Sequence, residues 1–385
     1  MSGKWVKPGL LLLMQLWAVG GLCSPVQANT TIAGAPMATV RMAMLLPLRS
    51  SALGSAAEAV RAGLAAAHEQ EGHGVSLSLI ETDGSAPEVL AAYARASAEF
   101  DIVIGPLARS EVNTVAQRAA VIKPTIALAS RDALEGDAPM PAKLLAMGLS
   151  IEDDARQVAH WIANGKPGGT AFIISTNAPW QRRAAKAFAV QWHSLGRKSQ
   201  LIELTLIESY LSGSSVASLR KRVRSEVPAL MFLALDPGQA SQLRSALGNE
   251  TAMYGTSQLN SLVRTAVDSP MPTDSAAIEV RASLGGVLLV DVPWQLQADH
   301  PAVMIYPQLL GQSDPPPTAD QARLYALGID AYRVAREMAL HGSRFELDGV
   351  TGKLSVRFEP GAAHFQRTAQ PAVYRDGLVV PVDER

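Results

Sequence analysis

Short apolar runs alternate with amphipathic stretches from residue 39 onward, and this alternation predicts the architecture. Residues 40–48 form an apolar run typical of a buried strand. In the stretch 55–70 that follows, Val60, Leu64 and Ala67 recur at the spacing of one helix face. The same alternation predicts further strands at 75–80, 101–104 and 125–129 and further helices at 87–100 and 110–121. Strands separated by helices in this order are typical of parallel βαβ units.

A second series of the same kind begins after residue 150. It predicts helices at 152–164, 180–195, 214–224 and 238–247 and strands at 171–175, 201–207 and 229–235. It continues with an apolar run at 285–292, a long helix at 322–340 and short strands joined by turns over 347–382. We therefore expect an α/β protein in which two parallel sheets follow one another.

The first 28 residues have the pattern of a secretory signal. Lys4 and Lys7 precede an apolar run at 10–19, and the small-residue motif Val26-Gln27-Ala28 follows it. The apolar run is too short for a helix that crosses a hydrocarbon core of about 30 Å. We therefore expect a signal peptide over 1–28, cleavage after Ala28 and a periplasmic product.

Cys23 is the only cysteine in the sequence, and it decides whether the protein is tethered. A bacterial lipoprotein box requires a small residue immediately before the acylated cysteine, whereas Leu22 stands there. An outer-membrane lipoprotein anchored at Cys23 is therefore the less favoured alternative. Cleavage after Ala28 would leave no thiol, which would exclude disulfides and cysteine chemistry.

Length and charge narrow the class of protein further. Residues 29–385 are long enough for two domains, and they carry 32 basic and 35 acidic residues, a net charge of −3. This balance does not favour nucleic acid as a partner. Over the whole chain, 48% hydrophobic and 18% charged residues are typical of a well-buried globular protein.

The turns after the predicted strands carry the candidate ligand-binding residues. Open parallel sheets bind ligands at the carboxyl ends of their strands. Each hydroxyl in these turns is more simply interpreted as a helix cap, so only convergence on one cleft would favour a ligand. The candidates for a small ligand in such a cleft are Ser50, Ser51, Ser130, Trp180 and Asp236.

Catalytic and metal motifs are weak. His68 and His73 lie five residues apart, whereas two imidazoles on one helix face require a spacing of four. No serine lies in a G-x-S-x-G motif, and residues 165–170 lack the spacing of a phosphate loop. We therefore expect no enzyme activity, no metal and no cofactor.

The segment 151–226 is basic within an acidic chain. It contains eleven Lys/Arg and six Asp/Glu, and residues 220–224 are its densest part. A solvated helix face is the simpler interpretation. The alternative is a docking patch for an acidic protein surface. The candidate docking residues are Arg182, Arg183, Arg220, Arg222 and Arg224.

Six motifs spread over the chain resemble those of one family. They are LLPL at 45–48, IGPL at 104–107, LSIEDDAR at 149–156, VDVPW at 290–294, LYALGIDAYRV at 324–334 and DGVTGKLS at 348–355. Together they resemble the LppC/LpoA family of penicillin-binding-protein activators. The combination of VDVPW with the late LYALGIDAYR helix is the most specific part, because amino-acid-binding transport proteins also carry LLPL and IGP.

This resemblance implies a type I periplasmic-binding-protein-like fold, with two doubly wound parallel-sheet lobes joined by three crossovers. We expect lobe 1 to comprise 39–150 and 258–345, and lobe 2 to comprise 151–257 and 346–385. Long family members carry a helical-repeat domain before this fold, and the sequence between residues 29 and 40 leaves no room for one.

Two functions follow from the resemblance. The first is a periplasmic, non-enzymatic regulator of peptidoglycan synthesis that contacts a bifunctional penicillin-binding protein, and it predicts no tight amino-acid binding. The alternative is a solute-binding protein of an ABC transporter for amino acids or similar small polar ligands. Fold alone does not separate these two functions.

Overall fold

The computed structural model describes residues 39–131, 139–165, 168–261, 275–308, 317–340, 342–359 and 362–382. The predicted signal peptide and Cys23 lie outside these ranges. None of the helices described is long and apolar enough to cross a membrane.

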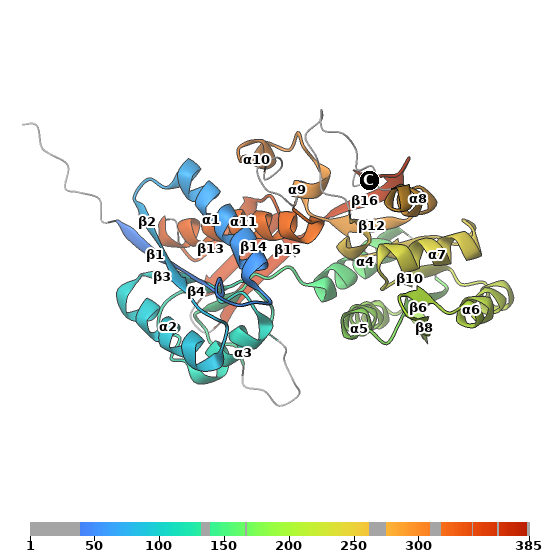
Figure 1. Cartoon of the computed structure of the whole chain (residues 1–385), viewed down its shortest axis with the longest axis horizontal. Coiled ribbons are helices and arrows are strands. Elements are labelled where there is room, and N and C mark those ends of the chain that lie inside the picture. Colours follow the sequence, from blue (N-terminus) through green and yellow to red (C-terminus); the bar gives the residue numbers. More distant parts are fainter. Residues whose placement is uncertain are drawn as a thin grey trace, which may run out of the picture. The chain divides into compact units, whose positions relative to one another are not determined.

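The first lobe is built on a five-stranded parallel sheet in the order β2-β1-β3-β4-β5 (Figure 1). Helices α1 and α11 pack on one face, and α2 and α3 pack on the other. The strands are β1 (Val40–Leu46), β2 (Val75–Glu81), β3 (Ile102–Ile104), β4 (Thr125–Ala127) and β5 (Leu144–Ala146), and the helices are α1 (Gly54–Glu71), α2 (Ala86–Glu99), α3 (Arg109–Arg118) and α11 (Ala319–Leu340).

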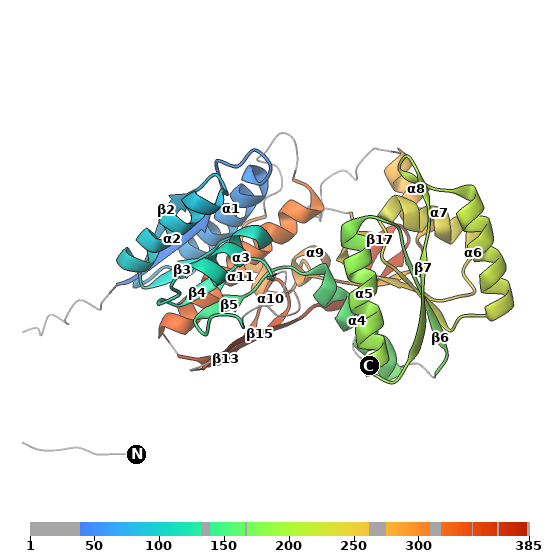
Figure 2. The same ribbon diagram turned by 90° about the horizontal axis from the view of Figure 1, so that it is seen from below.

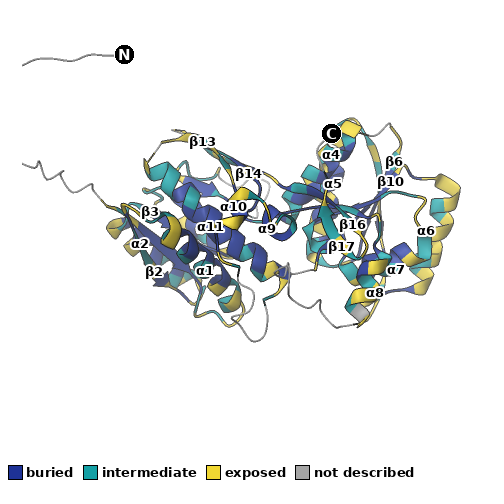
Figure 3. Ribbon diagram, turned by 90° about the horizontal axis from the view of Figure 1, so that it is seen from above, coloured by how far each residue is buried: buried dark blue, intermediate teal, exposed yellow. Residues whose placement is uncertain are grey.

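Two glycines allow α1 and α11 to pack closely. A Cβ atom at Gly63 would lie 2.0 Å from the Tyr325 carbonyl oxygen, and one at Gly328 would lie 2.3 Å from the Val60 carbonyl oxygen. The buried residues of α11 run along most of its length (Figure 3). This helix is therefore a core element of the first lobe, although it follows the second sheet in sequence.

The second lobe contains a seven-stranded sheet in the order β17-β16-β12-β11-β10-β6-β7. Its strands are β6 (Thr170–Ser175), β7 (Lys198–Glu203), β10 (Leu230–Leu233), β11 (Met253–Gly255), β12 (Leu288–Asp291), β16 (Gln370–Arg375) and β17 (Leu378–Pro381), of which β16 and β17 run antiparallel to their neighbours. Helices α4 (Ile151–Gly165) and α5 (Pro179–Ser194) pack on one face, and α6 (Gly213–Glu226) and α7 (Pro237–Leu247) pack on the other (Figure 2). Helix α8 (Ser275–Ser283) packs beside α7, and the hairpin of β8 (Leu206–Ile207) and β9 (Tyr210–Leu211) precedes α6.

A third, antiparallel sheet packs on the first lobe. It consists of β13 (Arg344–Asp348), β14 (Lys353–Glu359) and β15 (Ala362–Thr368). Leu354 and Val356 on its inner face belong to the same buried cluster as α1 and α11. The short elements η1 (Ser257–Leu259), α9 (Pro293–Leu296) and α10 (Pro301–Met304) complete the described structure.

The predicted α/β fold class is confirmed, with two parallel-sheet lobes and three crossovers. The chain passes between the lobes near residues 148–150, 291–292 and 368–369.

The lobe boundaries differ from the predicted ranges at two places. Helix α8 and strand β12 lie in the second lobe instead of the first, because an apolar run predicts a buried element without indicating which sheet buries it. Strands β13 to β15 pack on the first lobe instead of the second, because their apolar side chains complete the core under α11.

Candidate functional site

A pocket of about 340 Å³ lies between the two lobes at the crossovers. Residues from both lobes and from all three crossovers line it. They are Arg109, Leu149, Ser150, Ile151, Asp154, Trp180, Arg183, Ser257, Gln258, Asp291, Val292, Asp320, Arg323, Leu324, Arg367 and Ala369.

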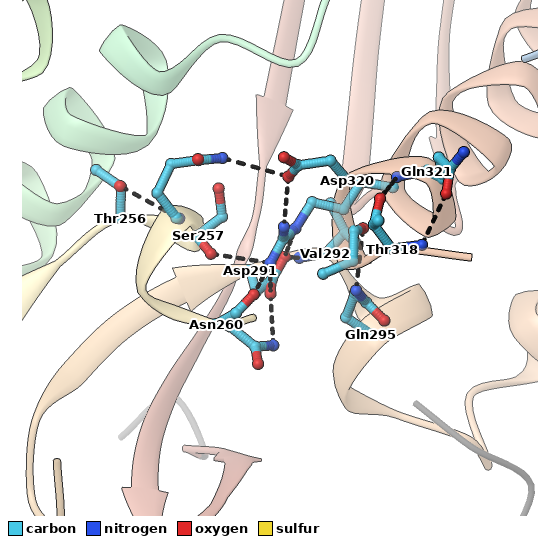
Figure 4. Close-up of polar contacts among 12 residues, drawn as sticks. Thr256, Ser257, Asn260, Asp291, Val292, Gln295, Thr318, Asp320 and Gln321 are labelled. Atoms are coloured by element: carbon cyan, nitrogen blue, oxygen red, sulfur yellow. Dashed lines mark hydrogen bonds and ion pairs between the residues drawn. The ribbon is translucent and has the colours of Figure 1, made fainter. Parts of the chain in front are cut away.

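A buried ion pair between Arg323 and Asp291 lies at the second crossover. Figure 4 shows the polar contacts around Asp291. The Arg323 guanidinium donates from Nε to Asp291 Oδ1 at 2.9 Å and from Nη2 to Asp291 Oδ2 at 2.8 Å. Nη2 also donates to the carbonyl oxygens of Ser257 and Asn260, and the Asn260 amide donates to Asp291 Oδ2. Burial alone would lower the pKa of Arg323, but the Asp291 carboxylate outweighs it, so the pKa is raised. The guanidinium therefore remains charged and ties α11 to the end of β12.

A second buried pair joins the first and third crossovers. Asp154 on α4 accepts a hydrogen bond of 2.6 Å from Ser257 Oγ, and one of its oxygens lies 3.9 Å from Arg367 Nη2. Arg367 Nη1 donates to the Gly148 carbonyl oxygen at 3.1 Å. Burial raises the pKa of the Asp154 carboxyl, while Arg367 and Ser257 oppose this rise.

Glu152 joins one arginine from each lobe. Its carboxylate accepts hydrogen bonds of 2.7 Å from Arg109 on α3 and 2.8 Å from Arg183 on α5. Ser150 Oγ donates to the same carboxylate at 3.0 Å. Burial would raise the pKa of Glu152, but the hydrogen bonds from Arg109 and Arg183 and the charge of Arg109 outweigh burial and lower the pKa to about 2.

The charged side chains around the pocket are thus largely neutralised by one another. Arg323 is balanced by Asp291 and Asp320, and Glu152 is balanced by Arg109 and Arg183. Two of these contacts, Arg323 with Asp291 and Arg109 with Glu152, join residues of different lobes, so the charged side chains form a polar connection between the lobes. In the parts of the chain that the structure describes, no three or more His, Cys, Asp or Glu side chains are placed to hold a metal ion.

Of the predicted ligand-cleft residues, Trp180 lines the pocket. Ser50 Oγ accepts a hydrogen bond from the Leu53 N–H before α1, and Asp236 accepts one of 2.8 Å from the Gln239 N–H as the cap of α7. Burial raises the pKa of Asp236. Ser51 is exposed and Ser130 is half-buried, and neither lines the pocket. A ligand role for these five residues remains a prediction.

The pocket residues that sequence reasoning missed are charged residues inside apolar patterns. Arg323 falls within the long predicted helix 322–340, and Asp154 falls in the acidic first turn of another. A charge at a helix position that should face the core was the available signal, because buried charges need a partner.

The predicted docking arginines divide between two faces of the second sheet. Arg182 and Arg183 lie on α5, whereas Arg220, Arg222 and Arg224 lie on α6 across the sheet (Figure 2). Arg182 forms an ion pair with Glu203, and Arg183 forms one with Glu152.

Arg222 is also engaged within the lobe. It pairs with Glu226 at 2.9 Å, donates to Gln200, and lies 5.2 Å from the centroid of the Phe172 ring. Arg220 and Arg224 are exposed. The exposed part of the predicted patch on α6 is therefore formed by Arg220 and Arg224.

Two parallel-sheet lobes with three crossovers define a type I periplasmic-binding-protein-like protein. The chain belongs to the LppC family, because the family model described as "LppC putative lipoprotein" matches residues 30–377. The resemblance predicted from the sequence motifs is therefore confirmed. Family membership and the relatives below indicate a periplasmic or outer-membrane-associated protein.

The similar proteins are named either as penicillin-binding-protein activators or as transport proteins. The penicillin-binding protein activator LpoA of Edwardsiella piscicida is 28% identical over 265 residues, which cover 61% of this chain and 36% of the relative. The chain thus spans about a third of that relative's length. The LpoA (YraM) C-domain from Haemophilus influenzae, described as a regulator of PBP1A, superposes with a TM-score of 0.67 at 22% identity and covers 89% of this chain and all of that domain.

A third similar structure is named as a transport protein. The "Structure of a putative branched-chain amino acid ABC transporter" from Chromobacterium violaceum ATCC 12472 superposes with a TM-score of 0.66 at 32% identity. The superposition covers 87% of this chain and 100% of that structure. Both predicted functions therefore have a named relative.

Proposed function

We propose that this protein is a periplasmic, non-enzymatic activator of a bifunctional penicillin-binding protein in peptidoglycan synthesis. The observation that carries the proposal is the match of the LppC family model to residues 30–377, which includes both lobes. The Edwardsiella relative that is named as an activator supports the same function.

The pocket between the lobes is consistent with a protein that works through its surface. Its arginines and carboxylates satisfy one another, and these contacts connect the crossovers. Binding energy for a partner protein would then come from exposed side chains, among which arginine and aromatic residues are the usual anchors.

We propose that the exposed arginines of α6 contribute to this contact. Charge reversal by Arg220→Glu and Arg224→Glu should weaken capture of the purified penicillin-binding protein and reduce the sensitivity of the remaining binding to salt. Arg95→Glu with Arg118→Glu is the matched control, because these two arginines are also exposed and lie on the first lobe, outside the predicted patch. A wild-type protein that captures no synthase would contradict the activator function, whereas full capture by the α6 variant would contradict this patch alone.

Export and anchoring form a separate part of the proposal. The signal peptide is cleaved after Ala28, and the mature protein is released into the periplasm. Intact mass of the protein from cells measures this directly. Acyl chains on Cys23 would replace this proposal with an outer-membrane lipoprotein.

Transport is the second candidate function, favoured by the relative from Chromobacterium violaceum. A solute-binding protein would hold its ligand between the lobes, where Trp180 and four arginines line the pocket. Binding of an amino acid in that pocket would distinguish it from an activator.

A further inference from the structure

The outer face of the three-stranded sheet places three basic side chains directly opposite one another. Arg344 on β13 pairs in register with Arg357 on β14, and Arg357 pairs with His364 on β15. All three residues are exposed. Like charges directly opposite each other destabilise a sheet, so this row is costly for folding. One carboxylate, that of Glu359, lies 3.5 Å from Arg344 and offsets part of the repulsion.

The two next rows of the same face are polar. Glu346, Ser355 and Gln366 form the second row, and Asp348, Lys353 and Thr368 form the third. Successive rows lie two residues apart along each strand, which corresponds to roughly 7 Å. The first row therefore presents the positive charges of two arginines. The second row presents a carboxylate, a hydroxyl and an amide, and the third presents one carboxylate and one ammonium group beside a hydroxyl.

Two hollows lie along the second and third rows. A hollow of about 460 Å³ is lined by the second and third rows, and a neighbouring one of about 370 Å³ shares Asp348, Lys353 and Thr368 with it. The second hollow extends to His300 and Gln297, beside the second crossover. The two hollows adjoin along the third row and together form a trough, and the basic row lies beside the second row, outside the hollows.

We infer that this trough is a docking site for an extended polypeptide segment of a partner protein that carries an acidic residue and, two positions further on, a basic residue. In an extended chain, residues i and i+2 lie on the same side and are separated by nearly the spacing of the rows. The acidic side chain pairs with Arg344 and Arg357, and the basic one pairs with Glu346. Gln366, Ser355 and Thr368 provide hydrogen bonds for the peptide groups of the segment.

Charge balance favours a peptide over an anionic lipid surface. The outer face carries Arg344, Lys353 and Arg357 against Glu346, Asp348 and Glu359, so a flat anionic surface meets equal numbers of cationic and anionic side chains. A segment with separated charges matches the sequence of rows, because electrostatic complementarity sets register and specificity. The inference rests on the proposed function only in taking the partner to be a protein.

The test uses a fluorescent peptide of the sequence Ser-Glu-Thr-Lys-Thr-Ser and the whole protein. We expect saturable binding that weakens with salt, and roughly tenfold weaker binding by the double variant Arg344→Thr, Arg357→Thr, since two exposed ion pairs are lost. The Glu-to-Gln peptide should bind as weakly as the double variant. Arg95→Thr with Arg118→Thr, at two exposed arginines on helices of the first lobe, is the matched control and should bind the peptide like the wild type.

Folding and partner identity are measured in parallel. The double variant should melt at the same temperature as the wild type or higher, because the like-charge row is removed. Absence of peptide binding to the wild type, or equal binding by the double variant, would overturn the docking site. Peptide binding without capture of a penicillin-binding protein would retain the docking site and contradict the proposed function instead.

Discussion

The Arg323 guanidinium and the Asp291 carboxylate form a two-bond ion pair with 5% and 0% of their side chains exposed. One residue belongs to the long helix of the first lobe, and the other ends a strand of the second sheet. Removing two charges from water is costly, and the pair persists because Asn260 and the Val292 N–H satisfy the remaining carboxylate lone pairs. The pair therefore connects the lobes at the second crossover.

Substitution of Arg323 should be severely destabilising. Arg323→Ala leaves Asp291 charged, buried and without its cation, and we expect a loss of about 3–5 kcal/mol in the free energy of unfolding. Urea denaturation measures it. Asp320→Asn is the control, because Asp320 contacts the same guanidinium from a side chain that is 66% exposed, and we expect about 1 kcal/mol or less. Equal losses in the two variants would contradict the central role of the buried pair.

Glu152 should make the free energy of unfolding depend on pH in the acidic range. Its pKa of about 2 lies below the unfolded value of 4.5, so its stabilising contribution is complete above pH 4.5 and is lost as the pH falls through about 2. Glu152→Gln should cost about 2 kcal/mol at neutral pH and flatten the stability profile in this acidic window.

The matched control for Glu152 is its neighbour in the same helical turn. Asp153 forms an exposed i,i+3 pair with Arg156, so Asp153→Asn should change stability by less than about 1 kcal/mol. Denaturation midpoints between pH 2 and pH 7 compare the two variants. If Glu152→Gln leaves the pH dependence of the free energy of unfolding unchanged, the ion pairs of Glu152 with Arg109 and Arg183 do not stabilise the fold, which would contradict this prediction.

The sequence predicted the two series of strands and helices well because apolar periodicity reports burial directly. It did not predict which sheet receives β12, since an apolar strand fits either one. It also did not predict the row of Arg344, Arg357 and His364, because strand register depends on the turns between strands and on tertiary packing.

The candidate site was predictable to a smaller extent. Trp180 lies in the pocket as expected from its place after a strand. Asp154, Asp291 and Arg367 come from three separate segments, and only the crossovers bring them together. Charge runs in sequence likewise did not indicate that α5 and α6 cover opposite faces of the sheet.

The arginines of α6 should differ in their effect on stability. Arg222→Ala removes an ion pair and the contact with the Phe172 ring, and we expect a loss of about 1 kcal/mol. Arg220→Ala and Arg224→Ala should stay within about 0.5 kcal/mol, because their side chains are exposed. Thermal denaturation of the three variants tests this order. A loss at Arg220 equal to that at Arg222 would contradict the exposed position proposed for the docking patch.

Amino acids should not stabilise the protein if it acts as an activator. A ligand at a hundred times its dissociation constant stabilises a fold by about 2.7 kcal/mol, which raises the melting temperature by several degrees. We expect no shift with leucine, isoleucine, valine or the other common amino acids. A clear shift with any of them would favour transport, and its loss in Trp180→Ala would locate the ligand in the pocket between the lobes.

The most direct measurement of the proposed activity is the rate of glycan polymerisation and peptide crosslinking by a purified bifunctional penicillin-binding protein from the same cells, with and without residues 29–385 of this protein. We predict a saturable increase that is diminished by Arg220→Glu with Arg224→Glu and retained by the first-lobe control Arg95→Glu with Arg118→Glu. Unchanged polymerisation and crosslinking at every concentration of the wild-type protein would contradict the activator function.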